Sequence, residues 1–473
     1  MALCLGGRKM KLRLSSKKTI HFLGIGGSGM SPIAHYLLDK GWKVSGTDVT
    51  PSEITHSLEK KGATLFYEHS ISNLDDVQLI VKSSAIKEDN IELKYAEKQG
   101  LIILKRAEML DYLMGYVSEK IAVAGTHGKT TTSAMVATML SYSQKDPHFI
   151  IGSTLTEFEA SFRVGNSNYF VAEADESDGS FLSLHPNWGI ITNIEEEHMA
   201  YFNSEARLLD HFRRFIEGIC NRNGEVMING DDPKLRELKT TFKKNSIYTY
   251  GLDKKNDLCA KNIQYAAEGI SFDCFQQDGH SFPVSLPAFG LHNVYNALAT
   301  VSLGKSLGLK ITDIQAGLTA FQGTSRRLQK IGCINNIHIF DDYGHHPTEI
   351  STTLSGLKNS LKNRLICVFQ PHRYTRTRDL LGDFASAFSL SDIVVITDIY
   401  AAGEEKISGI TGDVLAHLVK SRHGKEVMFI ADKSDVPSYL KNILKPKDVV
   451  VTMGAGDIHN VSKQLVQVLE EKR

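Results

Sequence analysis

Net charge is the first property that the sequence lacks: its 473 residues include 54 lysines and arginines and 54 aspartates and glutamates. A chain without a basic excess has no global field of the kind that attracts nucleic acid or an anionic membrane surface. We therefore expect no nucleic-acid partner, and any anion has to be recognised by a few local groups.

Cysteine is also scarce, and the six cysteines are scattered along the chain without a Cys-x-x-Cys pair. This pattern favours reduced thiols over a disulfide framework or a zinc site. No run approaches the ~18 consecutive apolar residues of a membrane span, so we expect no membrane insertion. The opening MALCLGG is too short for a signal peptide, and basic residues follow it instead of preceding it. We expect a cytoplasmic protein.

The chain is too long for one hydrophobic core, and we predict three domains. Strands and helices alternate over residues 18–118 and again over 327–473, which predicts two parallel, doubly wound sheets with right-handed crossovers. The expected fold is α/β, with a Rossmann-like N-terminal domain, a central P-loop ATPase-like domain over 119–326 and a Rossmann-like C-terminal domain. Residues 1–17, basic and rich in turn formers, are expected to be a loose leader.

The most informative stretch is IAVAGTHGKTTT, residues 121–132, which predicts an apolar strand, a tight glycine turn and a helix start. Backbone N–H groups at such a helix start, together with the Lys129 ammonium, favour phosphate. The usual P-loop spacing requires glycine at position 123, where this chain has Val123, so the motif is a shortened variant beginning at Gly125. The sequence predicts a triphosphate site; the alternative is an ordinary glycine-rich turn.

A second glycine loop lies upstream, where residues 24–29, GIGGSG, match the Gly-x-Gly-x-x-Gly pattern and Asp48 ends the following strand. In a dinucleotide site these glycines admit a diphosphate and the acid binds a ribose hydroxyl. A nucleotide sugar also carries a diphosphate, so the motif does not choose between NAD and a UDP-sugar. For Asp48 the alternative is a cap on a turn or helix.

Acidic residues follow two apolar strands of the middle segment, YFVAEAD and GIITNI. A carboxylate at a strand end beside a phosphate loop is the usual protein ligand of nucleotide-bound magnesium. We predict Glu173 and Thr130 as ligands. His198 follows three glutamates and is either a metal ligand or part of a solvated acidic loop. Asn293 and Asn296, near the start of a predicted helix, are either base contacts or helix caps.

Polar clusters end the strands of the C-terminal segment, where open α/β sheets bind their ligands. The adjacent aspartates and histidines at 341–346 lack the spacing of a helical metal site, and hydrogen bonding suits them better. The compact arginines Arg373, Arg376 and Arg378 favour a bound carboxylate or phosphate over a solvated basic face. The clusters are DDYGHHPTE, QPHRYTRTRD, YAAGE and GAGD.

Taken together, the chain resembles the Mur ligase family. The matching segments span residues 24–457 in family order, which is more specific than either glycine loop: GIGGSGMS, SGTD, SSAI, RAEML, AGTHGKTTT, VAEADESD, TNIEEEH, HNVYNALA, FQGTSRR, DDYGHHPTE, PHRYTRTRD, YAAGE and TMGAGD. The resemblance implies an ATP-dependent ligase that joins L-alanine to UDP-N-acetylmuramate through an acyl phosphate, the first amino-acid addition to a peptidoglycan precursor.

The resemblance also implies the roles of individual residues, with ATP and Mg²⁺ on the middle domain. The implied catalytic residues are Lys129, Glu173, His198 and His345, and the metal ligands are Thr130, Glu173 and His198. The implied ATP contacts are Gly125, Thr126, His127, Gly128, Lys129, Thr130, Thr131, Asn293, Asn296 and Arg327. The implied substrate contacts are Gly26, Gly27, Ser28, Gly29, Asp48, Ser83 and Ser84 for the UDP end, and Tyr343, His345, Arg373 and Arg376 for L-alanine.

Some positions depart from the family pattern, and some alternatives stay open. Glu197 stands where aspartate is common and Ala200 where a second aspartate is expected, which leaves the details of the metal site open. The alternatives are a ligase that recycles a murein tripeptide onto UDP-N-acetylmuramate, an NAD-dependent dehydrogenase, which would leave the ATP loop unexplained, and a non-catalytic nucleotide switch. A monomer or a homodimer is expected.

Overall fold

The computed structural model describes the chain except for residues 1, 6–7, 12–13, 15, 243–245 and 471–473. It divides into two compact units. The first contains Met1–Ala260, Cys274–Phe282 and Tyr295–Ala320, and the second contains Lys261–Asp273, Pro283–Val294 and Phe321–Arg473. The predicted domain boundaries near residues 118 and 326 stay predictions.

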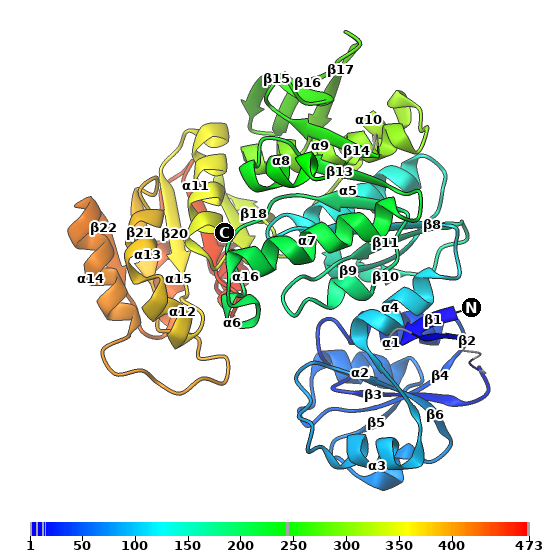
Figure 1. Cartoon of the computed structure of the whole chain (residues 1–473). Helices are drawn as coiled ribbons and strands as arrows, with labels where there is room; N and C mark the ends of the chain where they lie inside the picture. Colours follow the sequence, from blue (N-terminus) through cyan, green and yellow to red (C-terminus); the bar gives the residue numbers. More distant parts are fainter. Residues whose placement is uncertain (1, 6–7, 12–13, 15, 243–245, 471–473) are drawn as a thin grey trace. The chain divides into compact units, whose positions relative to one another are not determined.

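The first unit begins with a parallel five-stranded sheet in the order β5-β4-β3-β6-β7 (Figure 1). The chain leaves β3 at the point where the strand order reverses, and such a reversal opens a crevice at the carboxyl ends of the strands. The strands are β3 (Thr19–Leu23), β4 (Lys43–Thr47), β5 (Thr64–Phe66), β6 (Val77–Lys82) and β7 (Ile102–Lys105). The helices are α1 (Ser31–Asp39), α2 (Glu53–Lys60), α3 (Ile91–Gln99) and α4 (Arg106–Met114).

Ahead of this sheet, where the sequence predicted a loose leader, β1 (Ala2–Leu5) pairs antiparallel with β2 (Arg8–Lys11). Two strands of four residues are too short to produce a recognisable periodic pattern, and an isolated pair of this size is only marginally stable. Residues 1, 6–7, 12–13 and 15 of the predicted leader lie outside the described part of the chain.

Behind the first sheet, α3 contributes a buried carboxylate, Glu92, whose side chain is 0% exposed. Its Oε1 accepts hydrogen bonds of 2.8 Å from both Thr47 Oγ1 and Asn73 Nδ2, and lies 3.6 Å from His21 Nε2. His69 Nδ1 contacts the other carboxylate oxygen. Burial alone would raise the pKa of Glu92, but the hydrogen bonds, led by those from the two histidines, lower it to about 2.

The second sheet of this unit runs in the order β10-β9-β11-β8-β12-β13-β14, with β9 and β10 antiparallel and the other neighbours parallel. Of these strands the sequence predicted β8, β11 and β12 and missed the β9–β10 pair. The strands are β8 (Glu119–Ala124), β9 (His148–Leu155), β10 (Ala160–Arg163), β11 (Tyr169–Glu173), β12 (Trp188–Ile191), β13 (Glu225–Asn229) and β14 (Ile247–Gly251). Next along the chain come β15 (Leu258–Ala266), β16 (Gly269–Gln276) and β17 (Ser281–Leu286).

Helix α5 (Lys129–Tyr142) follows β8 directly and is buried along most of its length. It packs against α10, where a side chain at Gly317 would lie 2.5 Å from the Met139 backbone, so the glycine permits the close approach. The remaining helices of the middle segment are α6 (Met199–Phe202), α7 (Glu205–Cys220), α8 (Pro233–Thr240), α9 (Leu291–Ser306) and α10 (Ile311–Ala320).

The C-terminal sheet of the second unit has the order β18-β19-β23-β20-β21-β22, parallel except for β18. Strand β20 (Leu365–Phe369) is fully buried: Leu365, Cys367 and Phe369 enter one core cluster, and Ile366 and Val368 enter another. Alternate residues thus face helix layers on opposite sides of the sheet. The other strands are β18 (Gln329–Ile334), β19 (Ile337–Asp342), β21 (Ile393–Ile396), β22 (Glu426–Phe429) and β23 (Val449–Met453).

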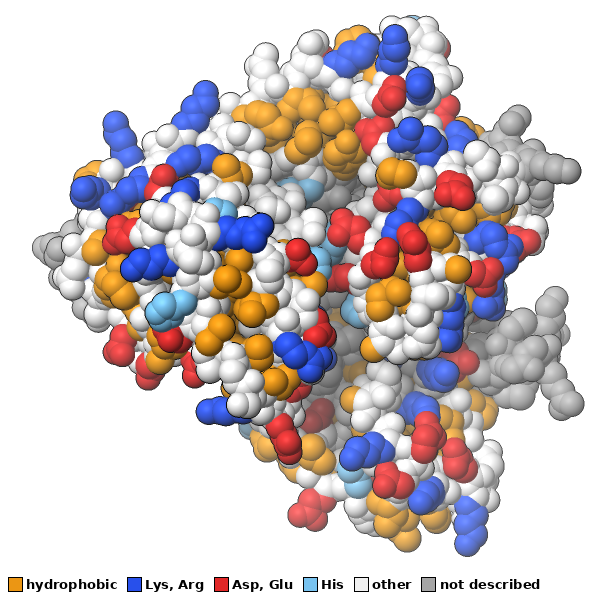
Figure 2. Space-filling model, turned by 60° about the vertical axis from the view of Figure 1, so that its left-hand side comes forward, with side chains coloured by type: hydrophobic (Ala, Val, Ile, Leu, Met, Phe, Trp, Pro, Cys, Tyr) orange, Lys and Arg blue, Asp and Glu red, His pale blue; other side chains and the backbone are white. Residues whose placement is uncertain are grey.

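Helices cover both faces of this sheet (Figure 1): α11 (Pro347–Leu361), α12 (Tyr374–Asp379), α13 (Leu381–Ala387), α14 (Gly412–His423), α15 (Val436–Ile443) and α16 (His459–Glu470). The predicted α/β class, with parallel sheets at both ends of the chain, is confirmed. Acidic and basic side chains are interspersed over the face shown in Figure 2. Among the described helices, none combines the length and apolarity that a membrane crossing requires.

Candidate functional site

The predicted phosphate loop connects β8 to α5, and its two glycines are both required by its shape. Gly125 has φ +131°, and a Cβ there would lie 2.0 Å from Thr192 Oγ1. Gly128 has φ +83° and precedes the first residue of α5; a Cβ there would lie 2.7 Å from Asn296 Oδ1. Asn296 also accepts a hydrogen bond of 3.1 Å from Thr132 Oγ1. The structure therefore brings Asn296 to the loop.

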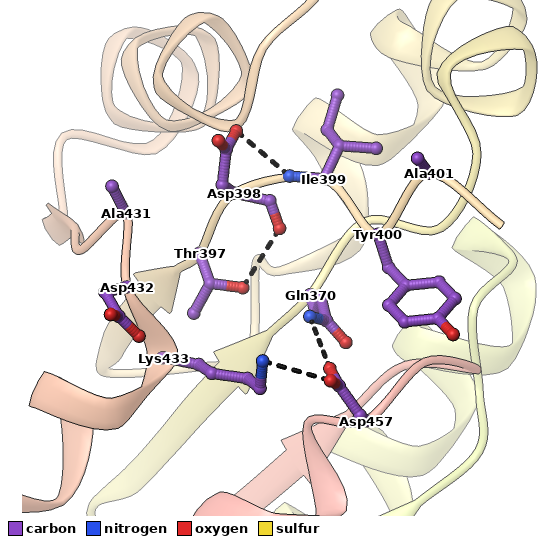
Figure 3. A pocket seen from close by; sticks show the side chains of 10 residues that line it. All are labelled: Gln370, Thr397, Asp398, Ile399, Tyr400, Ala401, Ala431, Asp432, Lys433 and Asp457. Carbon is purple, nitrogen blue, oxygen red and sulfur yellow. Dashed lines mark hydrogen bonds and ion pairs between the residues drawn. The ribbon is translucent and has the colours of Figure 1, made fainter. Parts of the chain in front are cut away.

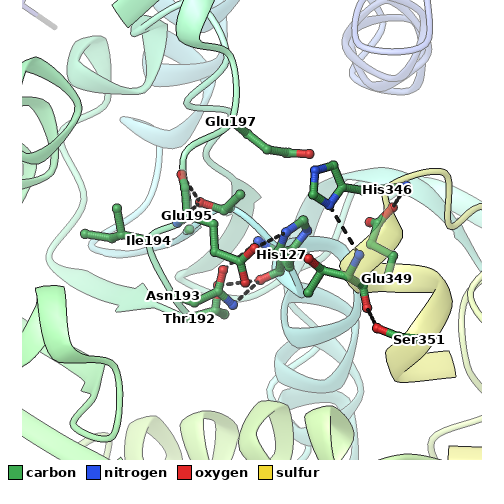
Figure 4. Close-up of polar contacts among 12 residues, drawn as sticks. His127, Thr192, Asn193, Ile194, Glu195, Glu197, His346, Glu349 and Ser351 are labelled. Carbon is green, nitrogen blue, oxygen red and sulfur yellow. Dashed lines mark hydrogen bonds and ion pairs between the residues drawn. The ribbon is translucent and has the colours of Figure 1, made fainter. Parts of the chain in front are cut away.

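The residues that follow β12 hold the loop in place (Figure 4). His127 N donates to Asn193 Oδ1 at 2.8 Å, and Asn193 Nδ2 donates back to the His127 carbonyl at 3.0 Å. Thr126 N donates to the Asn193 carbonyl, and Glu195 N donates to Thr126 Oγ1 at 2.8 Å. In the sequence, Asn193 lies near the end of the apolar run GIITNI; an amide side chain there can pair with a neighbouring backbone in both directions.

Lys129, the first residue of α5, points its ammonium back into the loop. Its Nζ donates to the carbonyls of Gly125 at 2.7 Å and Thr126 at 2.8 Å, and lies 2.8 Å from Glu176 Oε2. Burial by itself lowers the pKa of Lys129, but the charges of Glu176 and Glu173 outweigh this effect and raise it. Burial raises the pKa of Glu176 to about 7, although the Lys129 ammonium opposes that shift. Glu176 was missed in the sequence because it follows the strand-end acid by three residues.

Glu173 and a separate group of two glutamates and a histidine lie near this lysine. Glu173 ends β11, pairs in register with Val123 of β8, and accepts a hydrogen bond of 2.8 Å from Gly152 N. The second group brings Glu176, Glu197 and His198 together, with ligand atoms within 4.8 Å of one another. His198 Nε2 lies 3.9 Å from Glu176 Oε1 and 3.8 Å from Glu197 Oε2. Carboxylate oxygens with one imidazole suit a divalent cation, so this donor set fits the expected Mg²⁺.

Asp48 forms a hydrogen bond with the glycine loop that follows β3. Asp48 Oδ2 accepts a hydrogen bond of 2.9 Å from Gly26 N, and Oδ1 accepts one of 3.2 Å from Thr50 N. A Cβ at Gly24 would lie 3.3 Å from the Ser83 side chain, so the end of β6 also borders the loop. Asp48 therefore has the turn-capping role considered as the alternative, and its contact with a ribose stays a prediction.

Arg106 is a residue that sequence analysis missed. A Cβ at Gly29 would lie 2.9 Å from Arg106 Cδ, and Arg106 Nη2 lies 3.3 Å from Asp175 Oδ2. Burial alone would raise the pKa of Asp175, but the Arg106 charge and hydrogen bonds lower it. Arg106 thus connects the glycine loop of the first sheet with the acidic segment after β11. Its signal in the sequence was a basic residue at a helix N-terminus, where the dipole disfavours it.

In the second unit, the residues assigned to L-alanine gather at the carboxyl ends of β19 and β20. The Tyr343 and His345 rings lie 5.5 Å apart, and the His345 and His372 rings 5.9 Å apart. Arg376 Nη1 lies 3.2 Å from His372 Nδ1. Burial lowers the pKa of His372 to about 4, so its neutral ring can accept from the guanidinium at neutral pH. Sequence analysis did not single out His372.

Other predicted residues of this unit have structural partners. Arg373 caps α12 with φ +71°, and Arg327 stacks 5.4 Å from the Tyr343 ring and pairs with Glu349 at 3.4 Å. Asp342 accepts hydrogen bonds from Leu328 N at 2.8 Å and Gly344 N at 2.6 Å, and burial raises its pKa to about 6. Asp341 and Asp342, which end β19, therefore form hydrogen bonds, as their spacing indicated.

Comparison with known proteins gives matches along nearly the whole chain. Three family models match: "Mur ligase family, catalytic domain" over residues 19–117, "Mur ligase middle domain" over 123–304, and "Mur ligase, glutamate ligase domain" over 326–456. The UDP-N-acetylmuramate--L-alanine ligase of Syntrophus aciditrophicus is 41% identical, with 96% of this chain and 94% of that protein covered. The ligase of the same name from Geotalea daltonii is 43% identical, with 96% and 98% covered.

Solved structures agree with the sequence matches. The UDP-N-acetylmuramate-alanine ligase MurC from Thermotoga maritima has a TM-score of 0.82 at 30% identity, with 96% of this chain and 100% of that chain covered. A murein peptide ligase from Psychrobacter arcticus has a TM-score of 0.66 at 26% identity, with 96% and 98% covered. The shortened phosphate loop, the acidic residues around Lys129 and these matches lead to one conclusion: the chain belongs to the Mur ligase family.

Proposed function

We propose that this protein is an ATP-dependent ligase that joins L-alanine to UDP-N-acetylmuramate, releasing ADP and phosphate. The observation that carries the proposal is the buried Lys129 ammonium in a phosphate loop, on a chain that matches L-alanine ligases at 41–43% identity over nearly its full length. The ATP requirement and the five described cysteines outside any disulfide, Cys220, Cys259, Cys274, Cys333 and Cys367, support a cytoplasmic location.

Activation of the carboxylate is the step that the first unit performs. A carboxylate is a poor acyl donor, and transfer of the γ-phosphoryl group to it creates an acyl phosphate that the alanine amine attacks. Lys129 and the backbone N–H groups at the start of α5 hold the phosphates and neutralise the charge that develops on the transferring oxygens. The glycine loop after β3 and Arg106 are suited to the diphosphate of the UDP end.

A divalent cation would be held by Thr130 and Glu173, with His198, Glu176 and Glu197 as the second group of donors. When bound, Mg²⁺ supplies electrostatic stabilisation of the phosphate oxygens during transfer. In the second unit, Arg373 and Arg376 would bind the alanine carboxylate, and His345 and Tyr343 would border the amine.

A product assay tests the function. The protein is incubated with ATP, Mg²⁺, UDP-N-acetylmuramate and either one amino acid or the murein tripeptide, and product mass and ADP are measured. We expect L-alanine to give an amide product with one ADP per product. A tripeptide product without an alanine product would assign the recycling reaction instead, and nicotinamide absorbance changes would indicate a dehydrogenase.

The metal assignment predicts that Glu173→Gln raises the Mg²⁺ concentration for half-maximal activity by about 10- to 100-fold, because a ligand charge is lost. Activity is titrated against Mg²⁺, and tryptophan fluorescence or melting temperature checks folding. Glu217→Gln, on the exposed face of α7 where Glu217 pairs with Arg213, is the matched control. An unchanged Mg²⁺ titration in Glu173→Gln would remove Glu173 from the metal site.

A further inference from the structure

A cavity of about 460 Å³ opens at the carboxyl ends of β20, β21 and β22 in the second unit (Figure 3). Its lining includes Gln370, Tyr400, Ala401 and Asp457 from the polar clusters that end the strands, but no residue that was individually assigned to substrate or ATP. Its polar lining includes three carboxylates, Asp398, Asp432 and Asp457, and one ammonium, Lys433. The cavity therefore carries an excess of negative charge.

The polar groups of the cavity already have some hydrogen-bond partners, but one buried acceptor, the Gln370 side-chain oxygen, stays available. Lys433 Nζ lies 3.0 Å from Asp457 Oδ2, and Gln370 Nε2 donates to Asp457 Oδ1 at 3.0 Å. Gln370 is only 5% exposed, yet its Oε1 has no hydrogen-bond partner among the residues that the structure describes. A buried amide oxygen without a donor is costly, so a donor from a ligand would be favourable there.

Tyr400 lies between this cavity and His372, the neighbour of His345, which is assigned to the amino acid. Its ring lines the cavity and also stacks on His372, with centroids 5.5 Å apart and an interplanar angle of 8°. Two backbone hydrogen bonds fix the residue, from Tyr400 N to the Pro371 carbonyl at 2.8 Å and from Arg373 N to the Tyr400 carbonyl at 2.9 Å. A Cβ at Gly456 would lie 2.8 Å from Tyr400 Cγ, so this glycine makes room for the ring.

We propose that Tyr400 is a specificity-determining residue: its ring is the wall that closes the amino-acid subsite against the acidic cavity, and so excludes amino acids with long cationic side chains. The inference rests on the proposed function, because Arg373, Arg376 and His345 place the amino acid on the His372 side of the ring. A methyl side chain needs no space beyond that wall.

The chemistry of the cavity identifies the class of amino acid that removal of the wall admits. A side-chain ammonium supplies donors for the Gln370 oxygen and for the carboxylates of Asp398 and Asp457, and its charge offsets the negative excess. A neutral chain of equal length fills the same space but leaves the Gln370 oxygen without a donor and the negative excess without a counter-charge. L-lysine is therefore expected to exceed L-norleucine as a substrate once the ring is removed.

The test is an amino-acid panel with wild-type protein, Tyr400→Ala and Tyr400→Phe, in which product mass and kcat/KM are measured for L-alanine, L-norleucine and L-lysine. We expect Tyr400→Ala to raise the lysine-to-alanine ratio of kcat/KM at least about 10-fold, and the lysine-to-norleucine ratio as well. Tyr400→Phe keeps the ring, and its ratios should match those of the wild type.

An unchanged lysine-to-alanine ratio in a folded Tyr400→Ala protein would overturn the inference, and so would an equal gain for lysine and norleucine. Tyr400→Leu serves the same comparison if the alanine variant does not fold. Wild-type ligation of L-alanine is measured in the same experiment: its absence contradicts the proposed function, whereas its presence with an unchanged panel contradicts only the role of Tyr400.

Discussion

Replacing Lys129 with alanine is expected to lower kcat for ligation by about 1,000-fold or more, while binding of UDP-N-acetylmuramate stays close to that of the wild type. In the proposed function, the ammonium is the cation that the loop directs at the phosphates, and its loss leaves the charge on the transferring oxygens without its partner. The UDP end is there assigned to the other glycine loop, around Gly26 and Arg106. Turnover is measured by ADP release and UDP-substrate affinity by calorimetry.

Two control variants test whether the effect depends on a positive charge at position 129 and on the shape of the group that bears it. Lys239→Ala removes a lysine of α8 that is 40% exposed and lies 3.8 Å from Asp257, and it should leave kcat unchanged. Lys129→Arg keeps the charge, but its larger planar group does not fit the position between two loop carbonyls and Glu176, so it should restore little activity. Substantial ligation by Lys129→Ala would contradict the assigned role.

Replacing Glu92 with alanine is expected to lower the free energy of unfolding by about 3–5 kcal/mol, because it removes the buried acceptor of three donors and the carboxylate beside His21. Thr47, Asn73, His21 and His69 would lose their common partner. Glu92→Gln keeps the shape of the side chain without its charge and should lower the free energy of unfolding by a smaller amount. Glu59→Ala is the control, because Glu59 of α2 is also a carboxylate acceptor, for the Tyr67 hydroxyl, but this hydrogen bond is exposed. Denaturant unfolding at neutral pH measures all three.

The same carboxylate predicts a pH dependence with a definite sign. The folded pKa of Glu92, about 2, lies below its ordinary value of 4.5, so the folded state binds this proton less readily than the unfolded state. Its contribution, of order 3 kcal/mol, is fully present above about pH 4.5 and is lost as the pH falls towards 2. The stability difference between wild type and Glu92→Gln should therefore shrink below pH 4.5. A constant difference down to pH 3 would contradict the lowered pKa.

Local sequence patterns predicted much of the fold. Apolar strands that alternate with helices predicted the parallel sheets, since strands buried on both faces have continuous apolar runs, as β20 has. The glycines at 125 and 128 marked the phosphate loop because only glycine tolerates those backbone angles and contacts. The β9–β10 pair was missed because its strands, HFIIGSTL and ASFR, lack a turn signal of a common hairpin type between them.

The residues missed at the site depend on contacts between distant segments. Arg106 and Asp175 are 69 positions apart, and Asn193 pairs with His127 across 66 positions. Glu176 is a candidate site residue because it is buried and pairs with Lys129. The position of the Tyr400 ring depends on its contacts with His372 and Gly456. These pairings cannot be predicted from periodicity along the chain, because they depend on the order of strands within a sheet.

The ion pair between Lys129 and Glu176 has a consequence for how nucleotide arrives. Because the ammonium already has an internal counter-ion at 2.8 Å, phosphate entry is an exchange of one anion for another, not the filling of a bare positive site. The net gain in free energy is then the difference between two attractions, so we expect inorganic phosphate to bind weakly. In the proposed function, ATP overcomes this competition because its additional phosphate oxygens reach the N–H groups at the helix N-terminus.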